Sequence, residues 1–259
     1  MNGKYRIAFW SMLCLCLLGS ECQKKETFGQ IALKFSFSVD EEELQIGKMI
    51  YTNALGNLYQ VDEVKYFISD IQLFYDQGKQ LSITDNQSIH YIDNNIPSTL
   101  QWNIADHIPV GSYDSIRFTF GLPPAKNISN SFVNPPESNM AWPRELGGGY
   151  HYMQINGKWD NGSNYSPFLL HTGIGTVYNA DSSVQHIHNH FTVTLANANI
   201  TIEPDKRSSL TLNMNINNWF SNPHDFDLRI WADQPIMQSQ EAQLMLKGNG
   251  WNIFRGSYN

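Results

Sequence analysis

The sequence predicts an all-β protein, an antiparallel β-sandwich with a short C-terminal helix. Apolar and polar residues alternate with a period of two over most of the chain, which is the pattern of half-buried strands. Turn sequences rich in glycine, proline, asparagine and aspartate separate the alternating segments, and helical signals are confined to one stretch near the C-terminus. Because no Pro/Gly/Ser-rich linker interrupts this pattern, we expect a single domain.

The N-terminus, residues 1–21, is predicted to be a signal peptide. Lys4 and Arg6 give it a basic start, and the apolar run over 7–18 is too short to form a stable membrane anchor. Two small residues then come shortly before Cys22, which stands where a bacterial lipoprotein would begin. We therefore expect export and cleavage before this cysteine.

Cys22 is the expected lipidation site, followed by a linker within 22–30 and the sandwich domain over 31–259. The protein would then be an outer-membrane lipoprotein that faces the periplasm or the cell surface and meets the membrane only through its lipid anchor. Glu21 is unusual in this position, because a lipoprotein cleavage box has a small residue there. Ordinary secretion with a spare thiol is the alternative.

Strands, turns and one helix can be placed in order along the domain. Alternation predicts strands over 31–39, 116–120 and 210–216. Ser239 is expected to cap a helix over 240–247, which Gly248 would end. Turns are expected at Asp76-Gln77-Gly78, Pro109-Val110-Gly111, Pro123-Pro124, Asn156-Gly157 and Asn161-Gly162-Ser163.

Cysteine usage and charge narrow the chemistry. Cleavage before Cys22 removes Cys14 and Cys16, so no cysteine pair is left for a disulfide, a thiolate zinc site, an iron–sulfur cluster or blue copper. The formal net charge of −7 argues against nucleic acid and anionic lipid heads as partners. Histidine, methionine, carboxylates, asparagine and backbone oxygen remain as metal ligands.

Histidines concentrate in one part of the chain, since five of the eight lie between Met140 and His190. On a strand over 185–195, His186, His188 and His190 would share one face. Neighbours on that face have Cα atoms about 6.5 to 7 Å apart, whereas the outer two are about 13 Å apart, so at most two can serve one metal. A polar, solvent-facing strand side is the alternative reading.

Two further histidines stand where strands meet loops. His151 shares a strand face with Met153, and imidazole together with a thioether suits Cu(I) better than magnesium or calcium. His171 ends an apolar stretch just before Thr172 and Gly173. The predicted metal ligands are His151, His171, His188 and His190, with copper as the expected metal and zinc as the other choice. The alternative for His151 and His171 is a structural role, with His151 bonded to a carbonyl.

Several ordered blocks of the sequence resemble the MbnP-like domain, in the form seen in Bacteroidetes lipoproteins. The resemblance spans nearly the whole chain after the signal peptide. It rests on Tyr66-Phe67-Ile68-Ser69-Asp70-Ile71, Ile108-Pro109-Val110-Gly111-Ser112-Tyr113, Phe118-Thr119-Phe120-Gly121, Met140-Ala141-Trp142-Pro143, Gly149-Tyr150-His151-Tyr152, Leu170-His171-Thr172-Gly173, Leu212-Asn213-Met214-Asn215, Trp219-Phe220 and Asn249-Gly250-Trp251-Asn252-Ile253-Phe254.

This resemblance implies an exported β-sandwich concerned with copper. Family members paired with a di-haem peroxidase-like protein called MbnH have one tryptophan oxidised to kynurenine, whose amine joins histidines around copper. Trp142 matches that tryptophan best, although Pro143 and Arg144 follow it where the family pattern M-x-W-x-W-x-x-G-Y differs. An aromatic side chain packed beside a proline turn is the alternative for Trp142.

Catalysis by the chain itself finds little support, and we expect no enzyme. The sequence has no H-E-x-x-H, no G-x-S-x-G and no phosphate-binding glycine loop, and His224 beside Asp225 reads as a surface turn. The alternative to a metal-binding module is a metal-free recognition or adhesion domain that stacks Trp102, Trp159 and Tyr165 against a glycan or a protein. Metal-assisted hydrolysis is a third reading.

Overall fold

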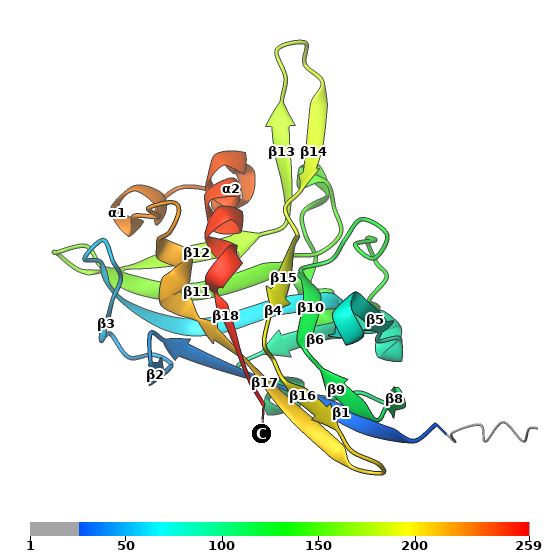
Figure 1. Cartoon of the computed structure of the whole chain (residues 1–259). Helices are drawn as coiled ribbons and strands as arrows, with labels where there is room; N and C mark the ends of the chain where they lie inside the picture. The colour runs from blue at the N-terminus through cyan, green and yellow to red at the C-terminus, as the bar shows by residue number, and fades with distance from the viewer. Residues whose placement is uncertain (1–25, 259) are drawn as a thin grey trace, which may run out of the picture.

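The computed structural model describes residues 26–258 and confirms the predicted β-sandwich (Figure 1). The predictions for the signal peptide and for lipidation of Cys22 lie outside the described residues. Strand β1 starts at Phe28, so the fold begins three residues before the predicted position 31. Among the described residues, no helix is long and apolar enough to cross a membrane.

The first sheet is built around the N-terminal strand and has the order β18-β17-β1-β2, with β7 and β8 also paired to β1. The β1–β17 pair is parallel, with Leu33 opposite Leu210, and is an exception in a mostly antiparallel fold. Its strands are β1 (Phe28–Val39), β2 (Glu42–Glu43), β7 (Gln101–Asn103), β8 (Ile108–Pro109), β17 (Arg207–Asn215) and β18 (Phe254–Tyr258).

The second sheet has the order β12-β11-β4-β10-β15, and β3, β5 and β6 also pair with the long strand β4. Its strands are β3 (Tyr51–Thr52), β4 (Leu58–Tyr75), β5 (Lys79–Ser82), β6 (Ile89–Asp93), β10 (Ser115–Phe120), β11 (Met153–Asp160), β12 (Tyr165–Thr172) and β15 (Phe191–Leu195). Two small sheets pair β9 (Gly111–Tyr113) with β16 (Ile200–Ile202) and β13 (Ile174–Tyr178) with β14 (Val184–His188). The β13–β14 hairpin projects from the body of the molecule (Figure 1).

The main core lies between the two sheets and is rich in aromatic rings. Leu33 of the first sheet and Tyr66 of the second are fully buried in it. The ring of Phe120 lies 5.5 Å from that of Tyr66 and 5.4 Å from that of Trp219, measured between centroids. Phe67, which points to the opposite face of β4 from Tyr66, belongs instead to a second apolar cluster. The second sheet is therefore buried on both faces near the middle of β4.

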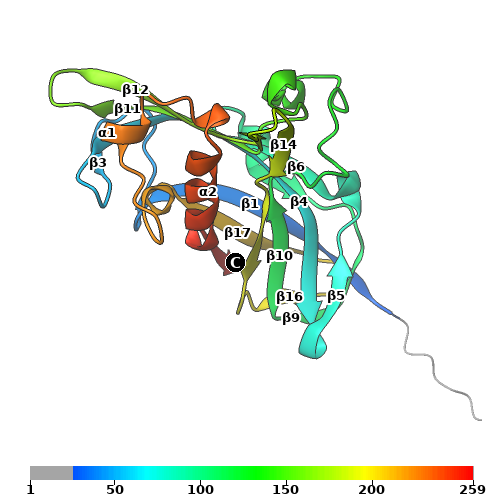
Figure 2. The same cartoon turned by 90° about the horizontal axis from the view of Figure 1, so that it is seen from above.

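Two short α-helices, α1 (Leu228–Trp231) and α2 (Gln240–Asn249), lie on the same side of the molecule as β11 and β12 (Figures 1 and 2). The predicted cap of α2 is confirmed, because Ser239 Oγ accepts a hydrogen bond from the Ala242 amide. The predicted end at Gly248 is wrong. A Cβ at Gly248 would lie 2.6 Å from the His224 ring, so this glycine allows close packing inside the helix.

Short 3-10 turns connect the elements. They comprise residues Asp76–Gly78, Asp85–Ser88, Pro97–Leu100, Glu137–Met140, Arg144–Leu146, Ile216–Phe220, Ile236–Gln238 and Gly250–Asn252. The first of these confirms the turn predicted at Asp76-Gln77-Gly78.

Two other local predictions are wrong. Asn156-Gly157 is a bulge inside β11, not a turn, and Gly157 is required because a Cβ there would lie 2.2 Å from the Gln60 carbonyl oxygen. The strand predicted over 185–195 breaks between β14 and β15, where Asn189 is buried in a side-chain network. Side chains that share a face on β14 therefore do not continue onto a face of β15, and His190 lies outside both strands.

Candidate metal centre

The candidate site lies on the outer face of the second sheet, where the segment 121–152 folds back over it. Two stretches of that segment run antiparallel and are joined by an isolated bridge between Ala141 and Tyr150. The Trp142 amide donates to the Gly149 carbonyl at 2.9 Å, and the His151 amide donates to the Met140 carbonyl at 2.7 Å. This pairing places Trp142 and His151 side by side.

Three consecutive glycines make the reversal possible. Gly147, Gly148 and Gly149 all have positive φ, between 68° and 109°, a region that costs little only for glycine. A Cβ on Gly149 would lie 2.4 Å from Asn127 Oδ1, which accepts a hydrogen bond from the Tyr150 amide. The Gly-Gly-Gly sequence before His151 is therefore a local requirement of the site.

The rings of Trp142, His151 and His171 form a consecutive series. The centroids of Trp142 and His151 are 4.7 Å apart with the planes at 78°, and those of His151 and His171 are 5.2 Å apart at 86°. Trp142 is 3% exposed and His151 is 6% exposed. The structure thus brings together two of the predicted ligands and the predicted modified residue.

Hydrogen bonds indicate which ring nitrogens carry protons. Nδ1 of His151 lies 3.0 Å from the Met140 carbonyl oxygen, which can only accept, so Nδ1 donates and the lone pair lies on Nε2. For His171, Nε2 lies 2.7 Å from Oδ1 of Asn156, whose Nδ2 donates to Glu63 at 2.7 Å. Since the amide is oriented by Glu63, His171 donates from Nε2 and its lone pair lies on Nδ1.

Nε2 of His151 is buried and has no hydrogen-bond partner within residues 26–258. An unpartnered buried acceptor is uncommon in a folded protein and requires an explanation. The opposite nitrogen of each imidazole donates to an oxygen acceptor, which is the arrangement that metal-binding histidines usually have. The lone pairs on Nε2 of His151 and Nδ1 of His171 are therefore the two nitrogen donors that this site offers.

Both imidazoles are held neutral. Burial lowers the pKa of His151 from 6.5 to about 4. Burial, followed by repulsion from His151 and Lys65, lowers the pKa of His171 from 6.5 to about 3. A neutral imidazole is the form that binds a metal, so neither ligand has to lose a proton at neutral pH.

The other two predicted ligands form a separate pair. The rings of His188 and His190 are 6.2 Å apart and both neighbour Tyr152, whose hydroxyl lies 3.4 Å from Nδ1 of His188. His186 is exposed on the projecting hairpin. Across the described residues, no three or more His, Cys, Asp or Glu side chains are grouped to hold a metal ion. The four predicted ligands therefore do not form one cluster.

Comparison with known proteins gives the same overall assignment as the sequence blocks. The MbnP family model matches residues 28–239. The chain belongs to the MbnP family. A solved structure of MbnP from Methylosinus trichosporium is similar in fold, with a TM-score of 0.56 and 16% sequence identity over 88% of this chain and 98% of that one. No curated protein matches the sequence.

Three groups around the site of this MbnP-family chain were missed in the sequence. The Met140 carbonyl orients His151, Asn156 orients His171, and Glu63 orients the amide of Asn156. Asn156 is a polar residue within a strand, but the Asn156-Gly157 pair predicts a turn and hides this signal. The Met140 carbonyl carries no sequence signal, because every residue has one.

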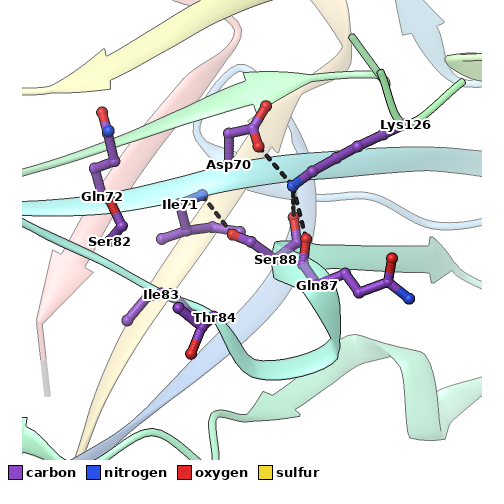
Figure 3. A pocket seen from close by; sticks show the side chains of 9 residues that line it. All are labelled: Asp70, Ile71, Gln72, Ser82, Ile83, Thr84, Gln87, Ser88 and Lys126. Carbon is purple, nitrogen blue, oxygen red and sulfur yellow. Dashed lines mark hydrogen bonds and ion pairs between the residues drawn. The ribbon is translucent and has the colours of Figure 1, made fainter. Parts of the chain in front are cut away.

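A separate surface cavity of about 370 Å³ lies between β4 and β5, lined by Asp70, Ser82 and Lys126 among others (Figure 3). Asp70 and Lys126 are its charged residues, and they pair with each other at 2.5 Å. Lys126 Nζ also donates to the Gln87 carbonyl at 2.6 Å. Since these groups satisfy one another, the cavity offers no free charge for a ligand.

The aromatic residues expected to form an adhesion surface do not do so. Trp102 is 6% exposed, stacks on His90 with centroids 5.0 Å apart and donates from Nε1 to Asp85. Trp159 is 7% exposed and lies in the main core. Of the three, only Tyr165 is exposed, so the prediction of an exposed Trp102 and Trp159 is wrong.

Proposed function

We propose that this protein is an exported copper-binding lipoprotein that holds the metal between His151 and His171. The observation that carries the proposal is the buried, unpartnered Nε2 of His151 in a ring that lies 5.2 Å from the His171 ring. Membership of the MbnP family supports a copper-related role. Two neutral nitrogen donors suit copper, and zinc is the other metal that such donors bind well.

Two imidazoles provide fewer donors than most copper or zinc sites have, and Trp142, once oxidised, would supply another. Its indole contacts the His151 ring, and its Nε1 donates to the Leu146 carbonyl at 3.1 Å. Oxidation to kynurenine would turn this ring nitrogen into a primary aromatic amine on a ring that contacts His151. When bound, copper would be the cargo of the site, and the residues of the chain would hold and orient it.

The oxidation of Trp142 requires an external oxidant. Removal of four electrons, with two oxygen atoms from water added across the indole C2–C3 bond, breaks that bond and gives the N-formyl derivative. Hydrolysis then releases formate and frees the amine. A di-haem peroxidase-like partner of the MbnH type, the partner that the family resemblance implies, would pass the four electrons to two molecules of hydrogen peroxide. These take up the four protons released by the oxidation and become four molecules of water.

The remaining features of the proposal concern location and activity. The predicted signal peptide and the predicted lipidation of Cys22 support export and anchoring at the outer membrane. The chain would act as a copper carrier without catalytic activity of its own. The acidic net charge supports a role that does not involve nucleic acid.

The test is metal analysis combined with peptide masses for protein purified from its native host. We expect about one copper per chain and a gain of about 4 Da on the peptide that contains Trp142. His151→Ala and His171→Ala should each lower the copper content at least about tenfold, whereas His107→Ala, an exposed histidine elsewhere, should not change it. Metal-free protein with unmodified Trp142, or equal copper in all three variants, would contradict the proposal. If zinc is bound in place of copper and is lost in the same two variants, the site is retained and copper is wrong as its metal.

A further inference from the structure

A buried amide network connects helix α2 to the candidate metal centre. Gln243 of α2 is 0% exposed and Asn189, in the break between β14 and β15, is 3% exposed. The two side chains are hydrogen-bonded to each other at 3.0 Å, and Gln240 donates to Asn189 Oδ1 at 2.9 Å. Gln243 Nε2 donates to the Met237 carbonyl, so the polar atoms of this network have partners.

The network holds both polar groups of one residue, Gly173. The Gly173 amide donates to Gln243 Oε1 at 3.0 Å, and Asn189 Nδ2 donates to the Gly173 carbonyl at 3.1 Å. Gly173 lies between the end of β12 at Thr172 and the start of β13 at Ile174, where its amide and carbonyl have no strand partner of their own. Side chains therefore replace the sheet hydrogen bonds at this position.

Gly173 in turn forms one wall of the space that Trp142 occupies. A Cβ on Gly173 would lie 2.6 to 2.8 Å from three atoms of the indole ring, so the ring packs directly on the glycine backbone. Another neighbour of that ring is His151, 4.7 Å away between centroids. Trp142 is thus held between His151 and a backbone segment that the two amides fix.

We propose that Gln243 and Asn189 are positioning residues that clamp Gly173 and thereby set the placement of Trp142 against His151. The expected effect on copper affinity rests on the proposed function, whereas the positioning of Trp142 does not. A hydrophobic residue at 243 would fill the same volume, but it would leave the Gly173 amide unpaired in a buried place. The amide at 243 therefore has a role that core packing does not explain.

The test compares Gln243→Met, which keeps the length of the side chain and removes the amide, with two controls in the full-length protein. Glu241→Ala changes an exposed residue on the same helix, and Ile236→Val removes one methyl group from the core next to it. Gln243→Glu is the rescue variant, because it retains the acceptor for the Gly173 amide. Trp142→Phe identifies the Trp142 indole N–H resonance in the NMR spectrum.

In metal-free protein produced without the di-haem partner, so that Trp142 keeps its indole, Gln243→Met should shift the Trp142 indole resonance and speed hydrogen exchange of the Gly173 amide at least about tenfold. Copper affinity should fall about tenfold, with partial recovery in Gln243→Glu and no loss in either control. A lower melting temperature with an unshifted Trp142 resonance and unchanged Gly173 exchange would overturn the clamp. If wild-type protein purified from its native host binds no copper, the proposed function fails, whereas the resonance and exchange data on the unmodified protein still decide whether Gln243 and Asn189 position Gly173.

Discussion

Replacing His151 by asparagine should remove much of the acid sensitivity of the metal-free protein. The asparagine amide can replace Nδ1–H as donor to the Met140 carbonyl, and it does not titrate. Burial lowers the pKa of His151 in the folded chain from 6.5 to about 4. As the pH falls below about 6.5, the unfolded chain binds a proton that the folded chain does not, so the free energy of unfolding decreases.

The size of this loss follows from the two pKa values. Between pH 7 and pH 4, a shift from 6.5 to about 4 corresponds to about 3 kcal/mol in the free energy of unfolding. Below about pH 4 the folded chain also binds the proton and the loss levels off. The substitution also removes one of the causes that lower the pKa of His171, because His151 repels its charged form. The free energy of unfolding of the variant therefore depends even less on pH.

The assay is urea unfolding of the wild type and His151→Asn at pH 7, 6, 5 and 4, with metal removed. The free energy of unfolding of the variant will be lower by an amount that does not depend on pH, because the variant loses ring contacts with Trp142 and His171. The difference in unfolding free energy between the two proteins should move in favour of the variant by about 3 kcal/mol from pH 7 to pH 4. Parallel curves over that range would refute the reasoning, and His107→Asn serves as the exposed control.

Three further predictions concern neighbouring features. Asn156→Ala should weaken copper binding about 10-fold to 100-fold in competition with a chelator, because His171 loses the acceptor of its Nε2 proton; equal affinity would argue against that orientation. Gly157→Ala should lower the free energy of unfolding by about 3 kcal/mol in urea titrations, since a Cβ would lie 2.2 Å from a backbone oxygen, and a loss under about 1 kcal/mol would show that the bulge can adjust. Trp102→Ala should cost about 3 to 5 kcal/mol, as expected for a buried ring, whereas Tyr165→Ala should change stability by less than about 0.5 kcal/mol; similar small losses would indicate that both rings are exposed.

Much of the secondary structure could be predicted because it depends on local patterns. Alternation at 31–39 and 116–120 gives strands in the structure, the strand predicted over 210–216 ends one residue early at Asn215, and the Ser239 cap begins α2 as expected. Local patterns failed where a residue has a nonlocal reason. Gly157 and Gly248 are small because another segment packs against them, and a sequence window contains no information about that segment.

For the candidate site, the sequence by itself determined the residue types, namely imidazoles near a Gly-Gly-Gly reversal and a tryptophan in a family motif. Only the tertiary structure decided that His151 and His171 meet beside Trp142, while His188 and His190 lie around Tyr152. The physical reason is that strand alternation fixes which side of a strand a residue faces, whereas its neighbours depend on which strands pair and in what register. The hydrogen bonds of Asn156 and Gln243 to the site are set by the same long-range pairing.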